Sequence, residues 1–332
     1  MGKRKIAVLG ADSFSGQDLV DLLLDDPENE VIGISRSAEK SSLFLSYKLR
    51  KDLSRYRYFK LDLNHDMPAL LGLLDSEKPD HMVNFAAQGE VAPSWDRPED
   101  WLETNCVALA RLVNHLRKQN YLRRYLHISS PEAYGDFTGK IDEAAALNPS
   151  TPYAASKAAA DMLLKAYHRQ FKFPLLTVRS TNVYGARQQL FKIIPRSVIC
   201  LKTGKKIQLH GGGKAIKSYI HIRDVSRGER EILFKGRIGE IYHLSPDSGI
   251  SIRDLVATVC RLMSKSFEDS TEAVAERPGQ DAAYVIDSAK ARKYFSWKPA
   301  VPLEAGLRET IRWVEENWEL IRDLPLQYLH KQ

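Results

Sequence analysis

The chain has 332 residues, of which 43% are hydrophobic and 27% are charged, and its formal net charge is +7. This length and composition allow a large buried core in one large domain or two smaller ones. The 49 basic residues are dispersed among 42 acidic ones. Because we find no zinc-finger spacing, aromatic RNA-binding signature or arginine-rich tail, we expect no nucleic-acid partner.

The sequence also indicates no membrane, disulfide or metal chemistry. No segment approaches the roughly twenty apolar residues that span a bilayer, and no signal peptide is visible. Three widely spaced cysteines, Cys106, Cys200 and Cys260, predict neither a disulfide framework nor a zinc site. No His, Asp or Glu cluster has metal-ligand spacing. We therefore predict a cytoplasmic protein with no metal and no membrane partner.

The first predicted elements indicate a dinucleotide-binding turn. Lys5–Leu9 is apolar and β-branched, as in a buried parallel strand, and the apolar residues of Gln17–Leu24 have helical spacing. Between them, glycines stand where a tight turn and close helix packing need them, and the helix N-terminus offers N–H groups to a pyrophosphate. Ser13 replaces the usual middle glycine, and its hydroxyl could donate to phosphate. An ordinary strand-to-helix turn is the alternative. The predicted cofactor contacts are Gly10, Ser13, Phe14, Ser15 and Gly16.

The second predicted strand, Glu30–Ser35, is followed by Arg36 and Ser37, and neither Asp nor Glu occurs between Val31 and Ala38. An acidic side chain at this place binds both ribose hydroxyls of NAD, whereas an arginine suits the 2′-phosphate of NADP. The alternative for Arg36 is a solvated surface position. We predict that the cofactor is NADP in preference to NAD.

Two further strands are predicted to complete the cofactor site. Tyr58–Leu63 places Asp62 and Leu63 at a strand end, where they could bracket the adenine. His81–Ala87 ends in the small residues Ala86 and Ala87, which let a cofactor approach the backbone. Strands alternate with helices up to about residue 185. We therefore predict an α/β fold with a Rossmann-type doubly wound parallel sheet.

Tyr153 and Lys157 lie four residues apart, so on a helix their side chains share one face. A free tyrosine has a pKa near 10 and is a poor base at neutral pH. A neighbouring cation would favour the phenolate and lower that pKa. A serine upstream could hold a substrate hydroxyl while the tyrosine takes its proton.

These motifs, in this order and spacing, resemble the extended short-chain dehydrogenase/reductase family, and within it the nucleotide-sugar 4,6-dehydratases and epimerases. The resemblance covers nearly the whole chain and is carried by the glycine turn, Asn84–Gln88, Ser129–Gly135, Tyr153–Lys157, Arg179–Gly185 and Glu276–Asp281. It implies two interwoven lobes: residues 1–185 with about 219–247 bind the cofactor, and residues 186–218 with 248–332 form a smaller substrate lobe. It also implies a homodimer through a four-helix bundle of helices Asp100–Gln119 and Tyr153–Phe171. Packing within one subunit is the alternative for these helices.

The resemblance assigns catalytic roles as well. Ser130 matches the family's catalytic Ser/Thr, and Lys157 would tune Tyr153 and hold the nicotinamide ribose. Tyr153 would take the O4 proton while hydride leaves sugar C4. Glu132 lies two residues past Ser130, so on an extended strand both would face the same side. This Ser-x-Glu pattern is similar to that of 4,6-dehydratases, where the carboxylate removes the C5 proton. Sugar-acid decarboxylases share it, and simple 4-epimerases lack it. A surface charge is the alternative for Glu132.

Pro131 departs from the thymidine-diphosphoglucose dehydratases, which have an aspartate there that helps the C6 hydroxyl leave as water. The GDP-mannose dehydratases also lack that aspartate, and they resemble this chain in the arginine after the second strand and in Ala87-Gln88. Proton delivery to the leaving hydroxyl would then come from Glu132 or from a water.

Other family positions contact the sugar nucleotide, and they match Gln88, Ser130, Asn182, Lys192, Lys217 and Arg277. Arginine binds phosphate through a fork and lysine as a point charge; Lys217 replaces a commoner arginine. The resemblance therefore implies an NADP-dependent nucleotide-sugar 4,6-dehydratase that keeps its cofactor tightly bound and recycles it. The alternatives are a C4 epimerase or a UDP-uronate decarboxylase of the same family, or a catalytically silent NADP-binding protein.

Overall fold

The computed structural model describes residues 3–137, 139–276 and 283–330. Its largest element is a seven-stranded sheet in which every neighbouring pair of strands is parallel. In spatial order the strands are β12 (Ile241–Leu244), β7 (Leu175–Ser180), β5 (Arg124–Ile128), β4 (His81–Asn84), β1 (Arg4–Leu9), β2 (Asn29–Ser35) and β3 (Tyr56–Lys60). The predicted Rossmann-type sheet is confirmed.

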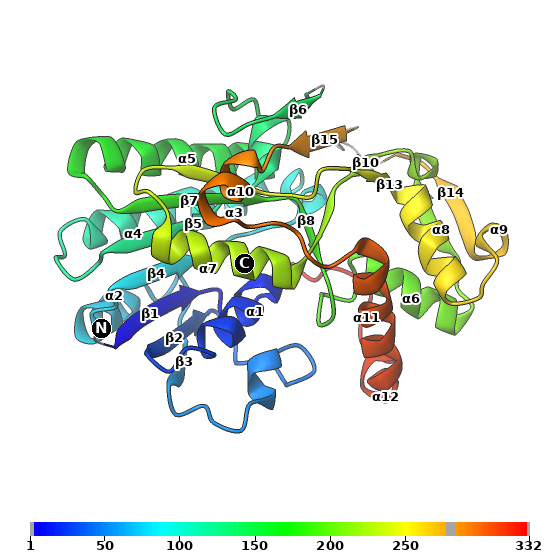
Figure 1. The fold of residues 1–332 in the computed structure, drawn as a ribbon, viewed down its shortest axis with the longest axis horizontal. Helices are drawn as coiled ribbons and strands as arrows, with labels where there is room; N and C mark the ends of the chain where they lie inside the picture. The colour runs from blue at the N-terminus through cyan, green and yellow to red at the C-terminus, as the bar shows by residue number, and fades with distance from the viewer. Residues whose placement is uncertain (1–2, 138, 277–282, 331–332) are drawn as a thin grey trace.

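The chain enters this sheet at β1, runs outward through β2 to β3, and then returns to the other side of β1 as β4 (Figure 1). The strand order therefore reverses between β1 and β4. In open α/β sheets, ligands bind at the carboxyl ends of the strands beside such a switch point. The glycine turn after β1 and the small residues after β4 meet there.

Two predicted strands end earlier in the structure than in the sequence-based assignment, each because a side chain starts a turn. After β3, the backbone N–H of Asn64 donates to the Asp62 side chain at 2.7 Å. After β4, the N–H of Ala86 donates to the side-chain oxygen of Asn84 at 3.0 Å. Such Asx-type bonds compete with strand pairing. Asp62 and Ala86 therefore lie in loops just past their strands.

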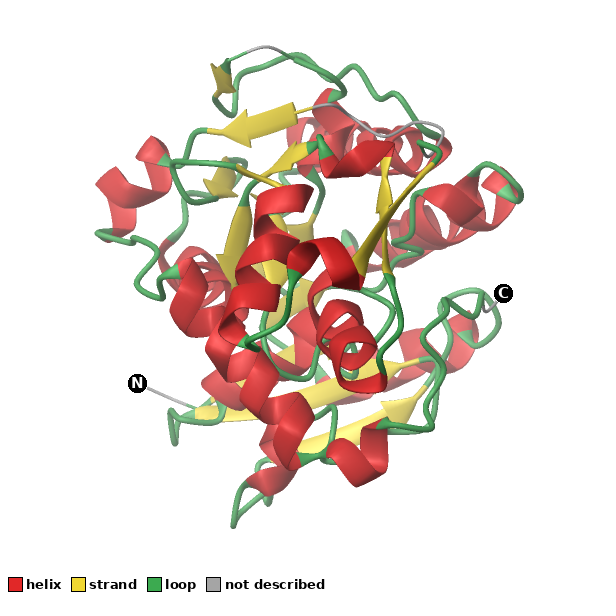
Figure 2. Ribbon diagram, turned by 90° about the vertical axis from the view of Figure 1, so that its right-hand side faces the viewer, coloured by secondary structure: helices red, strands yellow, loops and turns green. Residues whose placement is uncertain are grey.

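Helices cover both faces of the sheet (Figures 1 and 2). One face packs against α1 (Phe14–Leu23), α7 (Ile222–Lys235) and α10 (Ala289–Phe295). The other packs against α2 (Met67–Glu77), α4 (Leu109–Leu116) and α5 (Pro152–Phe171). The strands supply apolar side chains to both faces, as expected for a parallel sheet that is buried on both sides.

The helix predicted over Asp100–Gln119 is interrupted. The structure has α3 (Pro98–Leu102), then a π-helical stretch over Glu103–Ala108, and then α4. The π-helical stretch carries Asn105, whose side chain bonds both the N–H and the C=O of Gln88, at 2.9 and 3.1 Å. π-Bulges are frequent at functional sites. Here the bulge ties the loop after β4 to the helix layer.

A second group of elements surrounds its own core, and Figure 1 shows it on the right-hand side of the molecule. It contains α6 (Ile193–Thr203), β9 (Ile207–His210), α8 (Ile252–Leu262), α9 (Phe267–Ser270), β14 (Thr271–Val274), α11 (Leu303–Glu316) and α12 (Trp318–Ile321). α10 and Trp297 pack instead on the large sheet. The predicted lobe boundaries stay a prediction.

Short segments connect the two groups. A four-stranded sheet contains β13 (Ile250–Ser251), β10 (Ile216–Lys217), β15 (Ala283–Ile286) and β6 (Lys140–Ile141), and β8 (Asn182–Tyr184) pairs with β11 (Tyr219–His221). Single 3-10 turns occur at Ser46–Leu49, Ala92–Ser94, Pro131–Tyr134 and Gly211–Gly213. Within the described ranges, each helix is too short or too polar to cross a membrane.

Candidate active site

The turn between β1 and α1 needs glycine at both of the predicted positions. Gly10 has φ of +79°, and a Cβ added to it would lie 3.0 Å from the Ala86 nitrogen. A Cβ at Gly16 would lie 2.1 Å from the Gly10 carbonyl oxygen. Ser13 caps α1 by accepting the Gly16 N–H at 3.0 Å. Its own hydroxyl proton is still able to donate, so Ser13 suits both a helix cap and a phosphate neighbour.

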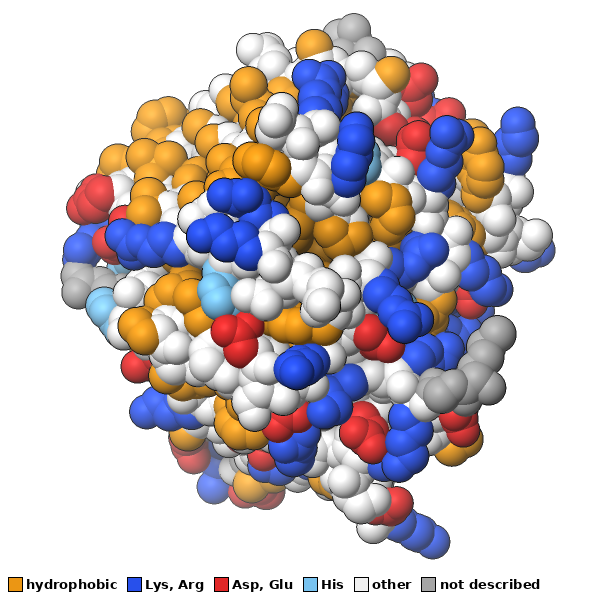
Figure 3. Space-filling view, turned by 90° about the vertical axis from the view of Figure 1, so that its left-hand side faces the viewer, with side chains coloured by type: hydrophobic (Ala, Val, Ile, Leu, Met, Phe, Trp, Pro, Cys, Tyr) orange, Lys and Arg blue, Asp and Glu red, His pale blue; other side chains and the backbone are white. Residues whose placement is uncertain are grey.

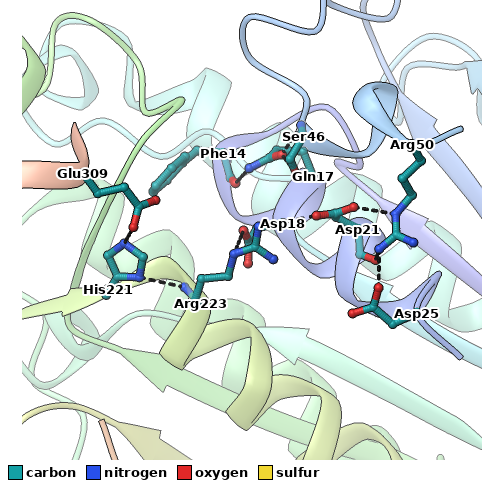
Figure 4. Close-up of polar contacts among 10 residues, drawn as sticks. All are labelled: Phe14, Gln17, Asp18, Asp21, Asp25, Ser46, Arg50, His221, Arg223 and Glu309. Atoms are coloured by element: carbon teal, nitrogen blue, oxygen red, sulfur yellow. Dashed lines mark hydrogen bonds and ion pairs between the residues drawn. The ribbon is translucent and has the colours of Figure 1, made fainter. Parts of the chain in front are cut away.

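Polar contacts fix α1 beneath this turn (Figure 4). The Gln17 side chain donates to the Phe14 carbonyl at 3.2 Å and accepts from the Ser46 N–H at 2.8 Å. Arg223, at the start of α7, lies 3.3 Å from the Asp18 carboxylate. The helix N-terminus is therefore held in place by residues from three parts of the chain.

A cavity of about 700 Å³ opens over the carboxyl ends of β1, β2 and β4. This size falls within the usual range of ligand pockets. It brings together most of the predicted cofactor contacts: Gly10, Ser13, Phe14, Arg36, Ser37, Asp62, Leu63, Ala86 and Ala87. Ser15 and Gly16 follow in the first turn of α1. The glycine cradle, the N-terminus of α1 at the cavity and the cationic end at Arg36 fit a dinucleotide.

Tyr153 and Lys157 are presented by the first turns of α5. Thr151 caps this helix by accepting the Ala154 N–H at 3.1 Å, and Pro152 takes the first helical position, where proline is favoured. The Lys157 ammonium is buried and donates to the Ile128 carbonyl at 2.7 Å. Lys157 thus anchors α5 to the end of β5, and it lines neither this cavity nor a smaller one beside Tyr153.

A second cavity, of about 230 Å³, collects the predicted reaction centre. It is lined by Ser130, Pro131, Glu132, Tyr153, Asn182 and Lys192, among others. The Lys192 ammonium pairs with Glu90 of the larger cavity at 2.6 Å. The two cavities are therefore neighbours that meet at this ion pair.

The local structure at Glu132 differs from the expectation. Ser130 and Glu132 do not continue a strand, because Pro131–Tyr134 forms a 3-10 turn that Ser130 caps. The Ser130 hydroxyl accepts the Glu132 N–H at 3.2 Å. Proline at the first position of a helical turn favours this conformation. The predicted extended strand over Ser130 and Glu132 was wrong, yet both residues still line the same cavity.

The titration of Tyr153 and Lys157, the predicted catalytic pair, also differs from the expectation. Burial raises the pKa of Tyr153 above its ordinary value, and the Glu132 carboxylate raises it further, while a hydrogen bond from Ser130 acts in the opposite sense. Burial lowers the pKa of Lys157 to about 8, and Asp161 opposes that fall. The expected lowering of the Tyr153 pKa is therefore not achieved by the protein groups alone.

Only some of the predicted substrate residues line one of the two cavities. The Asn182 side chain donates to the Ser218 carbonyl at 3.2 Å, at the wall of the smaller cavity. Gln88 lines the larger cavity. Lys217 lies on β10 and lines neither cavity. Arg277 lies outside the described residues.

Several residues of the larger cavity were not found from the sequence. They are Glu90, Arg187 and the segment Leu324–Leu329, which closes one side of the cavity. His330 fixes this segment: its Nε2 lies 2.7 Å from an Asp100 oxygen, and its ring stacks on Trp101 with centroids 5.1 Å apart. The sequence gives no signal for this contact, because it joins residues 230 positions apart.

Comparisons with known proteins agree with this geometry. The family model described as GDP-mannose 4,6 dehydratase matches residues 8–310. A dTDP-glucose 4,6-dehydratase of Neisseria gonorrhoeae is 29% identical over 337 residues, covering 95% of this chain and 97% of that one. A crystal structure of a dTDP-glucose 4,6-dehydratase from Streptomyces venezuelae, with NAD bound, has a TM-score of 0.87, is 29% identical, and covers 95% of this chain and 98% of that one. A UDP-glucuronic acid 4-epimerase from Bacillus cereus, 24% identical with a TM-score of 0.85 over 94% of this chain and 99% of that one, shares the fold.

Proposed function

This chain belongs to the GDP-mannose 4,6-dehydratase family, and we propose from that membership and from its site that it is a nucleotide-sugar 4,6-dehydratase. The observation that carries this proposal is the smaller cavity, around which Ser130, Glu132 and Tyr153 converge. A hydroxyl, a carboxylate and a phenol are the groups that oxidation at C4 followed by elimination across C5 and C6 requires.

The residues divide the reaction as follows. Tyr153 accepts the proton of the C4 hydroxyl, and Ser130 shares that hydrogen bond. A nicotinamide dinucleotide held in the larger cavity by the glycine turn and Arg36 would supply the hydride chemistry, with hydride leaving sugar C4 and later being added at C6. Once C4 is a ketone, the C5 proton is acidic and passes to Glu132, the C6 hydroxyl leaves as water, and a C5–C6 double bond forms. Re-reduction at C6, with a solvent proton added to C5 while Tyr153 releases to solvent the proton it took from O4, gives the 4-keto-6-deoxy sugar and resets both residues.

The leaving C6 hydroxyl needs a proton, and Pro131 has none to give. Glu132 becomes the protonated acid once it has taken the C5 proton, and it lies on the same cavity wall as Pro131. We propose that Glu132, directly or through a water, returns that proton to the leaving hydroxyl. One carboxyl would then serve as base and acid in turn.

For the cofactor, we propose a nicotinamide dinucleotide, and specifically NADP. The larger cavity has Arg36 and Lys40 at its β2 end, and Ser35 and Ser37 flank the arginine. This composition supports binding of a 2′-phosphate. The Streptomyces venezuelae relative was solved with NAD, so the preference for NADP rests on this chain's own residues.

The substrate class follows from the same membership: we propose a sugar nucleotide, with Asn182 and Lys192 at its diphosphate and Gln88 near the sugar. Lys217 and Arg277 stay predictions for the nucleoside and diphosphate. Lys192 is paired with Glu90 at 2.6 Å, so this carboxylate must share the lysine with an incoming phosphate.

A homodimer and a cytoplasmic location also stay predictions. The homodimer is supported by large apolar side chains that are exposed on the two helices concerned: Leu102 (45% exposed), Val107 (39%) and Met162 (65%). On the face shown in Figure 3, apolar side chains gather toward one side, while Lys and Arg are spread among acidic side chains. Sedimentation equilibrium of the full chain tests the dimer.

A panel of sugar nucleotides tests the proposed function. Each is incubated with the protein and its bound cofactor, and the products are analysed by mass spectrometry. Loss of one water from one or more substrates is the expected result. An isomer of unchanged mass would identify a C4 epimerase instead, and loss of carbon dioxide from a uronic acid would identify a decarboxylase. No reaction across the panel would point to a silent dinucleotide-binding protein.

A further inference from the structure

A buried ionic network begins at Asp161, one helical turn after Lys157. Asp161 follows Lys157 by one turn on the same face of α5. One Asp161 carboxylate oxygen accepts the Ser129 hydroxyl at 2.6 Å and an Arg179 guanidinium N–H at 2.6 Å. Arg179 is 1% exposed and Asp161 8% exposed. The pair is therefore removed from solvent, where charges act strongly on their neighbours.

The second Asp161 oxygen, Oδ1, accepts no hydrogen bond in the described part of the chain. It lies 3.6 Å from His127 Nε2. Burial, together with Lys157 and Arg179, holds the pKa of His127 well below its ordinary value, so this imidazole is neutral. Asp161 is thus the negative charge that acts on the Lys157 ammonium, and it is not neutralised by His127.

The charged and titratable groups around Lys157 come from four elements. Asp161 on α5 favours its ammonium form, Arg179 on β7 disfavours it, and the Cys106 thiol lies on the π-helical stretch. His127 on β5 is also within electrostatic range. The Asp161 charge also acts to raise the pKa of Tyr153 and of Tyr134. With Asp161 negative and both Lys157 and Arg179 positive, the cluster carries one net positive charge.

We propose that Asp161 is a positioning residue that keeps the Lys157 ammonium charged beside Tyr153, and that Arg179 limits this effect by pairing with the same carboxylate. The inference rests on the proposed function, because it concerns the residue that activates the catalytic tyrosine. It implies that the two members of the ion pair act on Lys157 in opposite directions.

The signs follow from removing one charge at a time. Asp161→Asn leaves two cations, Lys157 and Arg179, without the carboxylate, so Lys157 loses its proton at lower pH. Arg179→Met removes the competing cation, so the Asp161 charge acts on Lys157 alone. Lys157 then holds its proton to higher pH. The double variant removes both charges and should return close to the wild type. If Asp161 and Arg179 had only structural importance, each substitution would lower activity, and the two losses would add in the double variant.

The experiment measures Lys157 directly. The full chain, with its dinucleotide as purified, is labelled with ¹⁵Nζ-lysine and titrated by NMR, and Lys157→Arg assigns the resonance. We expect the midpoint to fall by about one pH unit or more in Asp161→Asn, to rise in Arg179→Met, and to recover in the double variant. Ser129→Ala, which removes a neutral donor to Asp161, should move it far less.

The kinetic readout is the pH profile of nicotinamide reduction in a single turnover. The alkaline limb, which reports loss of the Lys157 proton, should move with the NMR midpoint in each variant. Equal midpoints in wild type and Asp161→Asn would overturn the proposal. So would shifts of the same sign in both single variants.

If no sugar nucleotide reduces the cofactor, the proposed function fails, while the NMR titration still decides the role of Asp161. If Asp161→Asn does not fold, the opposite shift expected in Arg179→Met remains the test.

Discussion

At the scale of single residues, Glu132 separates elimination from oxidation in the proposed reaction. Glu132→Gln keeps the shape and the backbone hydrogen bond to Ser130 but removes the base. Oxidation at C4 should survive, and elimination should slow by roughly two to four orders of magnitude, the usual size of a general-base contribution. Reduced nicotinamide and a 4-keto sugar should then accumulate, which absorbance after rapid mixing measures.

The control for this variant is Glu316→Gln, an exposed carboxylate on α11, which should behave as wild type. If Glu132→Gln eliminates water at the unmutated rate, Glu132 is not the C5 base. If it instead interconverts C4 epimers at that rate, the reaction is an epimerisation.

Arg36 is the residue on which the choice of cofactor depends. A guanidinium–phosphate pair in a partly solvated site contributes on the order of 1.5–3 kcal/mol, so NADP should bind about ten- to a hundredfold more tightly than NAD. Arg36→Asp should erase or reverse the preference. Calorimetry of both dinucleotides with both proteins measures it, and Arg312→Asp, an exposed change on α11, is the control. Equal affinities in the unmutated protein would contradict the NADP proposal.

At the scale of elements, the fold was predicted from patterns that lie within single segments of the sequence. Lys5–Leu9 reads as a buried strand and forms β1 with one residue added, and Gly10 and Gly16 occur where the turn admits no Cβ. What failed was also local: Pro131 starts a 3-10 turn that strand alternation overlooked.

The parts of the site that the sequence did not predict depend on tertiary contacts. Asn105 reaches Gln88 only because a π-helical stretch interrupts the predicted helix. Asp161 meets Arg179 only because α5 packs over β7. No periodicity or motif encodes such pairings, since each partner is acceptable in its own segment without the other.

The segment Leu324–Leu329 yields a prediction at this scale. It borders the larger cavity and is fixed by His330 on Asp100 and Trp101. His330→Ala removes that hydrogen bond and the stacked ring, a loss of about 1 kcal/mol, so the bound dinucleotide should dissociate about fivefold faster. Stopped-flow fluorescence of the reduced dinucleotide measures the rate.

The control uses a second His–Asp pair, in which His115 Nε2 lies 2.8 Å from Asp75 on the surface of α4 and α2. Neither residue lines the cavity. His115→Ala should therefore leave the dissociation rate unchanged. If His330→Ala and His115→Ala release the dinucleotide at the same rate, the segment does not retain it.

At the scale of the whole molecule, stability depends on how α1 and α7 pack against each other. Glu229 of α7 is 0% exposed, and neither of its carboxylate oxygens has a hydrogen-bond partner in the described ranges. Burial raises the pKa of Glu229 from 4.5 to about 8, and the nearby Asp18 carboxylate acts in the same direction. An unpaired buried carboxylate is costly, so the group is protonated in the folded protein at neutral pH.

The direction of the pH dependence follows from proton counting. Between about pH 4.5 and pH 8, the folded state holds the Glu229 proton while the unfolded state releases it. The folded state therefore binds more protons in this window, and the free energy of unfolding falls as pH rises. The contribution is fully present below pH 4.5 and is lost as pH rises toward 8.

Glu229→Gln tests this directly, because glutamine is a neutral side chain of the same shape. The variant should lose this part of the pH dependence, and its unfolding free energy relative to wild type should increase by up to about 1.4 kcal/mol per pH unit across the window. Urea unfolding of the full chain at several pH values between 5 and about 8 measures the difference. In Glu316→Gln, an exposed change, the unfolding free energy should depend on pH as it does in the wild type. Parallel curves for Glu229→Gln and wild type would show that Glu229 titrates alike in the folded and unfolded states, against the burial argument.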